Sequence, residues 1–595
     1  MYRICTPHFL VISIMFVLFA GCDDDSTENI SAGEGAPKAM IHAPLSTFVG
    51  STVVLDGLAS SDPDSDSLSF QWTLMESPEG SGAFISASAE TPSITPDLPG
   101  AYRVSLTVSD GTHTSPAFIH TLMAFEAPEQ TLYVDAQAAT GGDGSEGSPF
   151  VTIQEAVDQA QSGDTIMVAG GDYLESILIP DTMSLILMGG YAPGNFAVRD
   201  TEDYPSHIIS QTTTAGISMD FGGNEGETGL LIIDGFTISA GTRGIRIDDQ
   251  GNGGMLFLTI TGNTIQENSG LTSGDDYGGG IFARAVSTII GNTVTNNSCG
   301  KGGGIAAFLQ SDDYGVIVSD NLVADNEAFA DHGGGIYVAA YRGTISHNII
   351  RNNAVMETYG WAGGLIIDGG IYDGYTDGIF VELFHNIYSG NFAPSSGSAL
   401  FIDEGANARI HHELIYGNTT SEGYSSGAIY VDGDRGTTRA ITLMEHCTVA
   451  MNQGGEGSVG QGLFLQGGVE VQVLNSVFWG NQGDTSIDFF VEEGSSLQLS
   501  YTLYGGGHEG DGAFTEEESL LDDPLFVDEG GDDFHLRSTA GHFDATAQSW
   551  VMDDVHSPGI DSGAPLSEWL REPSPNGSRV NRGAYGNTPE ASKSE

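Results

Sequence analysis

The sequence predicts an all-β protein in which a small β-sandwich precedes a long parallel β-helix, a solenoid of stacked coils. Three observations predict this fold: a glycine-led phrase keeps returning, each copy is trailed by a phrase ending in asparagine, and apolar residues recur at fixed distances before that asparagine. The final asparagines are 27 to 38 residues apart, a spacing typical of stacked repeats: Asn268, Asn297, Asn326, Asn353, Asn391, Asn418, Asn452 and Asn481.

Short strands, rather than helices, build each repeat. Positions eight and three residues before each asparagine are apolar in every copy, as at Ile289 and Val294 before Asn297. The apolar runs are short, β-branched and bounded by glycine, as strands are, whereas helical repeats need longer runs with a 3.6-residue period. Equivalent residues of successive coils should therefore stack about 4.8 Å apart.

This pattern resembles the right-handed parallel β-helix of the pectin-lyase-like superfamily, from Leu132 to the C-terminus. We place the β-helix at residues 165–510, roughly twelve coils and a rod on the order of 60 Å long. The resemblance implies that a lyase of this kind would need a Lys or Arg base near Ca²⁺-binding acids. Arg246, Arg284 and Lys301 fall in no such motif, so the resemblance predicts the fold and leaves activity open.

Residues 1–21 predict a secretion signal, because Arg3 is followed by an apolar stretch over residues 9–20 that is short for a membrane span. The stretch ends in LFAGC at residues 18–22, which resembles a bacterial lipoprotein box and implies lipidation of Cys22. The alternative is an ordinary signal peptide with an incidental cysteine. Polar residues 22–37 should form a disordered tether. We expect a location in the cell envelope, at the outer membrane or cell surface, held only by the lipid.

Residues 38–129 alternate apolar and polar side chains in short runs, as a β-sandwich does. Trp72 is the expected core tryptophan, and Tyr102 the expected tyrosine corner. The stretch resembles a PKD-type or cadherin-like immunoglobulin fold and could act as a spacer. Its Asp-rich turn could bind Ca²⁺, the one cofactor we expect, or could be a solvated turn; the candidate ligands are Asp62, Asp64 and Asp66.

Both ends of the stack need protection because unpaired strands would otherwise be exposed. Residues 130–164 contain the one good helical pattern, Thr152–Gln161, with Ile153, Ala156 and Val157 on one face. We predict that this segment is the N-terminal cap. Residues 511–595 depart from the repeat and are predicted to form the C-terminal cap.

The amino-acid composition limits the classes of partner that this protein could bind. The formal net charge is −62, from 18 Lys+Arg and 80 Asp+Glu. Such a surface repels nucleic acid and anionic membranes, and it disfavours polyanionic sugars unless Ca²⁺ screens the contact. Cys299 and Cys447 lie about five coils, or about 24 Å, apart and should not form a disulfide.

The glycine-led strand offers the candidate site, since its residues alternate inward and outward. One outward column is rich in aromatic rings, and the next contains three successive carboxyl groups that could be catalytic or bind a ligand. The aromatic residues are Phe282, Tyr337, Phe401, Tyr430 and Phe464, and the carboxyl groups are Asp368, Asp403 and Asp432. Rings suit sugar faces, and carboxylates accept hydroxyl hydrogen bonds or bind cations. Because stacked carboxylates repel, one should be protonated or a cation should lie among them.

Three functions remain open. The first is an envelope lipoprotein whose β-helix binds a polysaccharide, a cell-surface glycan or a protein along this strip. The second is a polysaccharide lyase or glycoside hydrolase, since carboxyl groups about 5 Å apart suit retaining glycosidases. The third is a passive structural spacer, which would follow if loops cover the strip.

Overall fold

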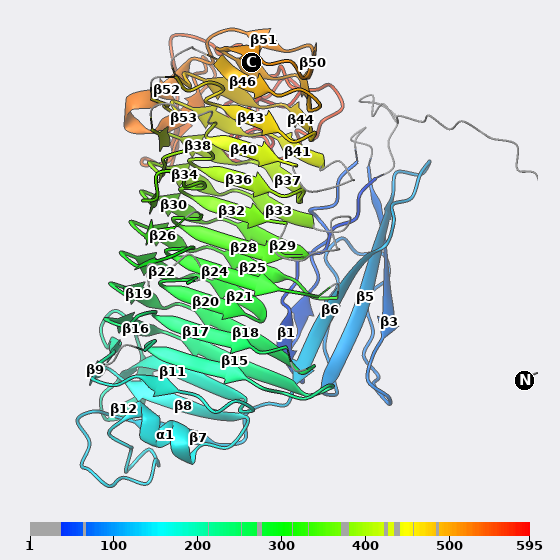
Figure 1. Ribbon diagram of the computed structural model, residues 1–595. Coiled ribbons are helices and arrows are strands. Elements are labelled where there is room, and N and C mark those ends of the chain that lie inside the picture. Colours follow the sequence, from blue (N-terminus) through cyan, green and yellow to red (C-terminus); the bar gives the residue numbers. More distant parts are fainter. Residues whose placement is uncertain are drawn as a thin grey trace, which may run out of the picture.

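The computed structural model describes residues 37–594 apart from 63–66, 212–213, 252, 271–275, 312, 331, 370–379, 422–426, 434–440, 456 and 484–486. Three long parallel sheets run the length of a rod, and a β-sandwich lies against its side (Figure 1). The fold class predicted from the repeats is confirmed. Among the described residues, no helix is both long and apolar enough to cross a membrane.

Sheet 1 contains the glycine-led strands and has 12 members, in agreement with roughly twelve coils. Its strands follow chain order along the rod, so each pairs with the coil before and the coil after. They are β10 (Ile177–Leu178), β14 (Ile217–Phe221), β17 (Ile245–Asp249), β20 (Ile281–Arg284), β24 (Ile305–Leu309), β28 (Ile336–Ala340), β32 (Leu365–Asp368), β36 (Leu400–Asp403), β40 (Ile429–Asp432), β43 (Leu463–Gln466), β46 (Ile487–Val491) and β49 (Gly507–Glu509).

Sheet 2 follows sheet 1 in each coil and has 15 strands. They are β7 (Thr131–Val134), β8 (Asp164–Ala169), β11 (Leu185–Ala192), β12 (Asn195–Arg199), β15 (Thr228–Asp234), β18 (Met255–Thr261), β21 (Val286–Ile290), β25 (Val316–Ser319), β29 (Arg342–Ser346), β33 (Phe380–Phe384), β37 (Asn407–His411), β41 (Ile441–Glu445), β44 (Glu470–Leu474), β47 (Ser496–Ser500) and β50 (Ala513–Glu517).

Sheet 3 completes the coil with 13 short strands. They are β9 (Gly171–Tyr173), β13 (Ser206–Ile209), β16 (Phe236–Ser239), β19 (Thr264–Gln266), β22 (Thr293–Thr295), β26 (Leu322–Ala324), β30 (Ile349–Arg351), β34 (Ile387–Ser389), β38 (Leu414–Tyr416), β42 (Thr448–Ala450), β45 (Val477–Trp479), β48 (Leu503–Tyr504) and β51 (Leu520–Leu521). A small fourth sheet joins β23 (Ser298–Cys299), β27 (Glu327–Ala328), β31 (Ala354–Val355), β35 (Phe392–Ala393) and β39 (Thr419–Thr420).

The inward columns form one continuous core. Register pairs Ile281 with Ile305, Ile305 with Ile336, and so on along sheet 1. The whole file is fully buried: Ile281, Ile305, Ile336, Leu365, Leu400, Ile429 and Leu463. Cys299 and Cys447 are buried and unpaired, as their predicted separation requires.

The recurring asparagines form a hydrogen-bonded ladder at the turn after sheet 3. Asn326 is typical: its backbone N–H and its Nδ2 both donate to Asn353 Oδ1, at 3.0 and 2.9 Å, and Nδ2 also donates to the Val294 carbonyl at 2.9 Å. Its own Oδ1 accepts the same pair of bonds from Asn297. Because an amide both donates and accepts, each asparagine satisfies buried backbone groups in neighbouring coils.

The N-terminal sandwich has the predicted core. Its four-stranded sheet has the order β1 (Ser46–Phe48), β6 (Phe118–Phe125), β5 (Gly100–Ser109), β3 (Ser69–Glu76), and β2 (Val53–Val54) pairs with β4 (Ser93–Ile94). Trp72 is buried and donates from Nε1 to the Ala89 carbonyl at 2.8 Å. The buried Tyr102 hydroxyl donates to the Leu98 carbonyl at 2.9 Å, which completes the tyrosine corner.

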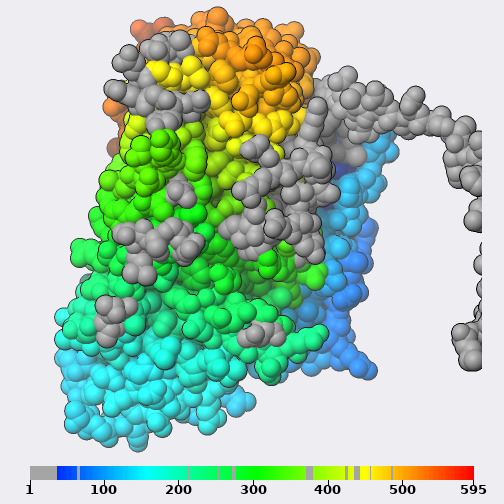
Figure 2. All heavy atoms as spheres, in the orientation of Figure 1, coloured from blue at the N-terminus to red at the C-terminus, as the bar shows by residue number. Residues whose placement is uncertain are grey.

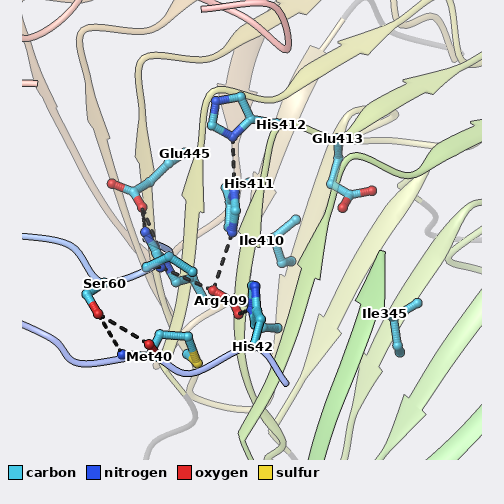
Figure 3. Close-up of polar contacts among 12 residues, drawn as sticks. Met40, His42, Ser60, Ile345, Arg409, Ile410, His411, His412, Glu413 and Glu445 are labelled. Carbon is cyan, nitrogen blue, oxygen red and sulfur yellow. Dashed lines mark hydrogen bonds and ion pairs between the residues drawn. The ribbon is translucent and has the colours of Figure 1, made fainter. Parts of the chain in front are cut away.

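The sandwich docks along sheet 2 rather than standing apart as a spacer. Leu45 and Met123 join the rod's core, and the Phe125 ring meets Phe257 edge-on at 5.6 Å. Further along, the contact is polar (Figure 3). His42 Nε2 donates to buried Glu382 at 2.8 Å, and Arg409 donates to the Ala59 carbonyl at 3.2 Å.

The two ends of the rod are protected differently. Helix α1 (Ile153–Gln159) lies at the first coil with Ile153, Ala156 and Val157 buried. The other end is formed by the strands β49, β50 and β51, whose residues are largely exposed. There Glu516 occupies the register position of the inward-facing Leu499. An inward carboxyl group and acidic edges are known protections of exposed strands.

The prediction that residues 511–595 cap this end is therefore wrong. Residues 511–521 complete the last coil, and the rest, which we call the closing segment (residues 522–594), folds back along sheet 3. The reason is apolar burial: Phe526, Phe534 and Ile560 pack with Val477 and Leu503 on the outer side of that sheet. Besides η1 (Glu529–Gly531), the closing segment contains β52 (Phe526–Asp528), β53 (Asp533–Leu536), β54 (His542–Asp544) and β55 (Ser549–Val551).

The asparagine ladder should dominate the stability of the middle coils. We expect Asn326→Ala to lower the free energy of unfolding by about 2–4 kcal/mol, because buried backbone groups lose their partners. Urea denaturation followed by circular dichroism would measure this. Asn296→Gly is the matched control, because Asn296 is exposed with φ 55°, a conformation that glycine adopts freely. Equal destabilisation by the two changes would contradict the proposed role of the ladder.

Candidate functional site

The three predicted carboxyl groups stack at the end of successive sheet 1 strands. Asp368, Asp403 and Asp432 are the last residues of β32, β36 and β40, and register pairs Asp368 directly with Asp403. Asp432 pairs onward with Gln466 on β43. Asp368 is buried, whereas Asp403 and Asp432 are partly exposed. We call these three residues the carboxyl column.

The aromatic strip, predicted to be exposed, is buried. Phe282, Tyr337, Phe401, Tyr430 and Phe464 are each no more than 6% exposed and form a second hydrophobic cluster on the outer side of sheet 1. Tyr430 packs on Phe401 and Phe464 at 4.8 and 5.4 Å between ring centroids. These rings therefore offer no face to a sugar, and their assignment as ligand contacts is corrected.

The glycine turns explain this burial. Gly278, Gly302 and Gly333, each first in its turn, have φ between 60° and 70°, so the chain bends back over the outward residue of the strand. A Cβ added at Gly302 would lie only 3.1 Å from the Tyr337 Cβ. Tyr277 and Trp361, which precede such turns, also pack against the ring cluster. Alternation distinguishes the two faces of a strand, but the covering turns decide which face meets solvent.

Burial and like charge act together on the carboxyl column. Burial raises the pKa of Asp403 to about 8, and the neighbouring Asp368, Glu404 and Asp432 add to the rise. Asp403 is therefore mainly protonated at neutral pH and can donate a hydrogen bond. The Tyr337 hydroxyl donates to Asp368, and the Tyr430 hydroxyl donates to Gln466 Oε1 at 2.8 Å. Burial, followed by the nearby aspartates, raises the pKa of both tyrosines.

An open hollow lies beyond the column, toward the end of the rod. Its volume is about 630 Å³, and it is lined by Phe490, Glu492, Glu493, Glu509, Gly510 and Asp511. Because Leu465 pairs with Val491, Glu492 is the residue next in line after Gln466. Acidic and amide side chains thus continue from the carboxyl column into a space large enough for a small ligand. The sequence analysis did not predict this hollow. The one sequence feature that could have indicated it is the pair of adjacent acids, Glu492 and Glu493, in its lining.

The basic residues of the early coils are engaged with acids. Arg246 pairs with Asp220 and Asp248, and Arg284 donates to Asp248 at 3.1 Å. Arg284 lies in the same outward position as Asp368, but three strands away, which is about 14 Å. Neither arginine can therefore act as a base at the carboxyl column.

Calcium binding stays a prediction. Asp64 and Asp66 lie outside the described residues, and Asp62 is half-buried beside them. Within the part of the chain that the structure describes, no group of three or more His, Cys, Asp or Glu side chains is arranged to hold a metal ion. That part includes all three members of the carboxyl column.

Comparison with known proteins identifies parts of the chain. Residues 34–123 match the family model of the PKD domain, and residues 483–563 match that of a family described as disaggregatase related. The first match coincides with the docked sandwich, and the second with the end of the rod and the start of the closing segment. No curated protein matches the chain.

Solved structures give weak likenesses. A nucleoside hydrolase-related hypothetical protein from Saccharophagus degradans, associated with carbohydrate metabolism, is 26% identical over 15% of this chain and 26% of its own, with a TM-score of 0.14. Pectate lyase Pel9A is 13% identical over 77% of this chain and 96% of its own, with a TM-score of 0.35. The complex of XylC with xylose is 11% identical over 78% and 99%, with a TM-score of 0.38. These TM-scores are low, so the strand register described above defines the fold.

The pKa of Asp403 predicts a pH-dependent stability. The ordinary value is 3.8 and the folded value is about 8, so the folded protein keeps a proton that the unfolded chain loses. This contribution is complete below about pH 4 and is lost progressively between about pH 4 and 8, because the unfolded carboxyl group ionises while the folded one keeps its proton. We expect Asp403→Asn to change the free energy of unfolding little at pH 4 and to raise it relative to the native protein at pH 9. Urea denaturation at both pH values tests this, with the exposed Asp522→Asn as control. A gain independent of pH would contradict it.

Proposed function

We propose that this protein binds neutral glycans in the cell envelope through the carboxyl column and the adjoining hollow. The observation that carries the proposal is the carboxyl column, in which Asp403 and Asp432 are partly exposed and Asp403 has a raised pKa, together with the adjoining hollow. Sugar hydroxyls both donate and accept hydrogen bonds, so a protonated Asp403 beside further carboxyl groups suits them. The net charge of −62 favours a neutral sugar over a polyanionic one.

Location in the envelope rests on the leader and on Cys22, which lie outside the described residues. If Cys22 is lipidated, Cys22→Ser should move the protein from the membrane fraction to the soluble fraction after cell lysis. Cys299→Ser is the control, because Cys299 is buried in the rod. Native protein in the soluble fraction, or unchanged membrane association of Cys22→Ser, would contradict the anchor.

A glycoside hydrolase is the second candidate, and one specific observation favours it. Asp403 has a raised pKa and lies next to Asp432 across one strand spacing, about 4.8 Å. A protonated acid beside a second carboxyl group is the arrangement that retaining glycosidases use. Asp403 would then be the acid, and Asp432 the nucleophile. A lyase has no comparable support, because the arginines of the same sheet are distant and paired.

Variants of Asp403 distinguish a binding site from a hydrolase. We propose screening neutral oligosaccharides on a glycan array and then measuring affinity by calorimetry and product release by a reducing-end assay. For a binding site, Asp403→Asn should keep affinity within about twofold, because an amide still donates and accepts, and Asp403→Ala should weaken binding about tenfold. For a hydrolase, Asp403→Asn should bind sugar but release no reducing ends.

The exposed Asp522→Asn is the control for both readouts. If no neutral glycan binds, or if Asp403→Ala and Asp432→Ala bind as tightly as the native protein, the proposed site is wrong. Such a result would favour a structural role for the rod.

A further inference from the structure

A column of four histidines runs along the turn between sheets 2 and 3. Each follows a sheet 2 strand and has φ between 51° and 57°. Their rings stack coil upon coil, with centroids 5.2, 4.8 and 5.0 Å apart. We call this set the histidine ladder: His347, His385, His412 and His446. The turns before and after it contain Gly291, Asp320 and Asn475 at the same position, also with positive φ, so the backbone does not require histidine there.

The closing segment covers one side of the ladder. His412 Nε2 donates to the Gly586 carbonyl at 3.0 Å. A Cβ added at Gly586 would lie 2.8 Å from His446 Nδ1, so the chain lies directly against that ring. His446 also faces Asn475, at 3.4 Å from Nε2 to Nδ2. Residues 581–586 therefore cover the buried His446 and one side of the half-buried His412.

The sandwich reaches the other side of the ladder through stacked rings. His42 stacks on Phe384 at 5.0 Å, and Phe384 stacks on His411 at 5.1 Å. His411 Nδ1 lies 3.0 Å from His412 Nδ1, and its Nε2 lies 3.4 Å from Glu382 Oε1 (Figure 3). The ladder thus lies where the rod, the sandwich and the closing segment meet.

The hydrogen bonds determine where protons lie at neutral pH. The Gly586 carbonyl can only accept, so His412 carries its proton on Nε2 and its Nδ1 is an acceptor. His411 must then donate from Nδ1. A further proton on His412 would place two N–H groups against each other and break this bond. At His411, by contrast, an added proton on Nε2 would face the carboxylate of Glu382.

Charged and titratable groups from every neighbouring element surround these rings. The sandwich contributes Lys38 and His42, the rod contributes Glu382, Arg409 and Glu445, and the closing segment contributes Arg571. Arg409 bridges Glu382 and Glu445 at 3.2 Å each, so both carboxylates are already compensated. Burial, followed by neighbouring histidines, lowers the pKa of His385 to about 4 and lowers that of His412 well below its ordinary value. Burial also lowers the pKa of His446 to about 4, although Glu445 opposes the change.

We propose that the histidine ladder is an acid-sensitive latch that holds the closing segment on the rod at neutral pH and releases it in acid. Rings 5 Å apart cannot all become charged while they stay covered. An open state, in which residues 581–586 lift away and the rings reach water, binds more protons than the closed state. Between the ordinary histidine pKa of 6.5 and about 4, a fall in pH therefore favours opening.

Hydrogen exchange measured by mass spectrometry on the full chain tests the latch. Between pH 7.5 and 4.5, after correction for the intrinsic pH dependence of exchange, we expect peptides covering residues 581–590 to lose protection at least tenfold. Peptides from the asparagine ladder at residues 321–353 should keep theirs. The triple variant His385→Asn, His412→Asn and His446→Asn should lose less than twofold, because asparagine cannot take up the protons. Asparagine also suits the turn, as Asn475 shows in the next coil.

The triple variant lacks the hydrogen bond from His412 to Gly586 at every pH. Comparing protection at the two pH values within each protein cancels this constant effect. His113→Asn, on an exposed sandwich loop, is the control and should behave like the native chain. If the triple variant does not fold, His446→Asn alone should at least halve the loss of protection. The latch is wrong if the native segment stays protected at pH 4.5, or if the asparagine variants lose protection as steeply as the native chain.

Discussion

The in-register stacking of parallel strands is the constraint on which the rest of the structure depends. Because each strand pairs with the equivalent strand of the next coil, every position in the repeat becomes a column of neighbours about 4.8 Å apart. A residue type that makes favourable contacts with its own kind is stabilised in such a column, and one whose side chains repel each other is destabilised. Asparagine suits it because its amide donates to one coil and accepts from another. Aspartate and histidine do not, because their charged forms repel.

The acids within the asparagine ladders follow the same logic. A second ladder runs along the turn after sheet 2 and is formed by Asn263, Asn292, Asn321, Asn348 and Asn386. Glu413 follows Asn386 in this column and accepts a hydrogen bond from Asn386 Nδ2 at 2.9 Å. Burial raises the pKa of Glu413 well above the ordinary value. Asp488 ends the ladder at the turn after sheet 3. It accepts a hydrogen bond from Asn481 Nδ2 at 2.9 Å and another from the backbone N–H of Gly505 in the next coil. Both acids therefore occupy the ladders as acceptors of the hydrogen bond that an asparagine oxygen would otherwise accept.

The sequence was enough to predict the repeating strands, but it did not predict which segments of the chain cover them. The period and the alternation were enough for the inward file at Ile281 and Ile305, and for the stacking of Asp403 on Asp368. Exposure of the outward columns depends on segments far away in the chain. His42 meets Glu382 across 340 residues, and no local pattern contains that contact. One partial signal was present: some outward positions of sheet 2 under the sandwich are apolar, as at Phe257 and Ile317, whereas Gln472 and Gln498 occupy outward positions further along the rod.

The segments that cover the rod also explain why the candidate site lies at the ends of the sheet 1 strands. The sandwich covers much of sheet 2, the closing segment covers part of sheet 3, and the glycine turns cover the ring column of sheet 1. Asp403 and Asp432 lie one residue position beyond that column, where the strands end, and there carboxyl groups remain partly open to solvent. A strand end next to a dry aromatic layer raises the pKa of a carboxyl group through burial and still leaves it accessible. The buried rings therefore still bear on the proposed function, because they create the environment that raises the pKa of Asp403.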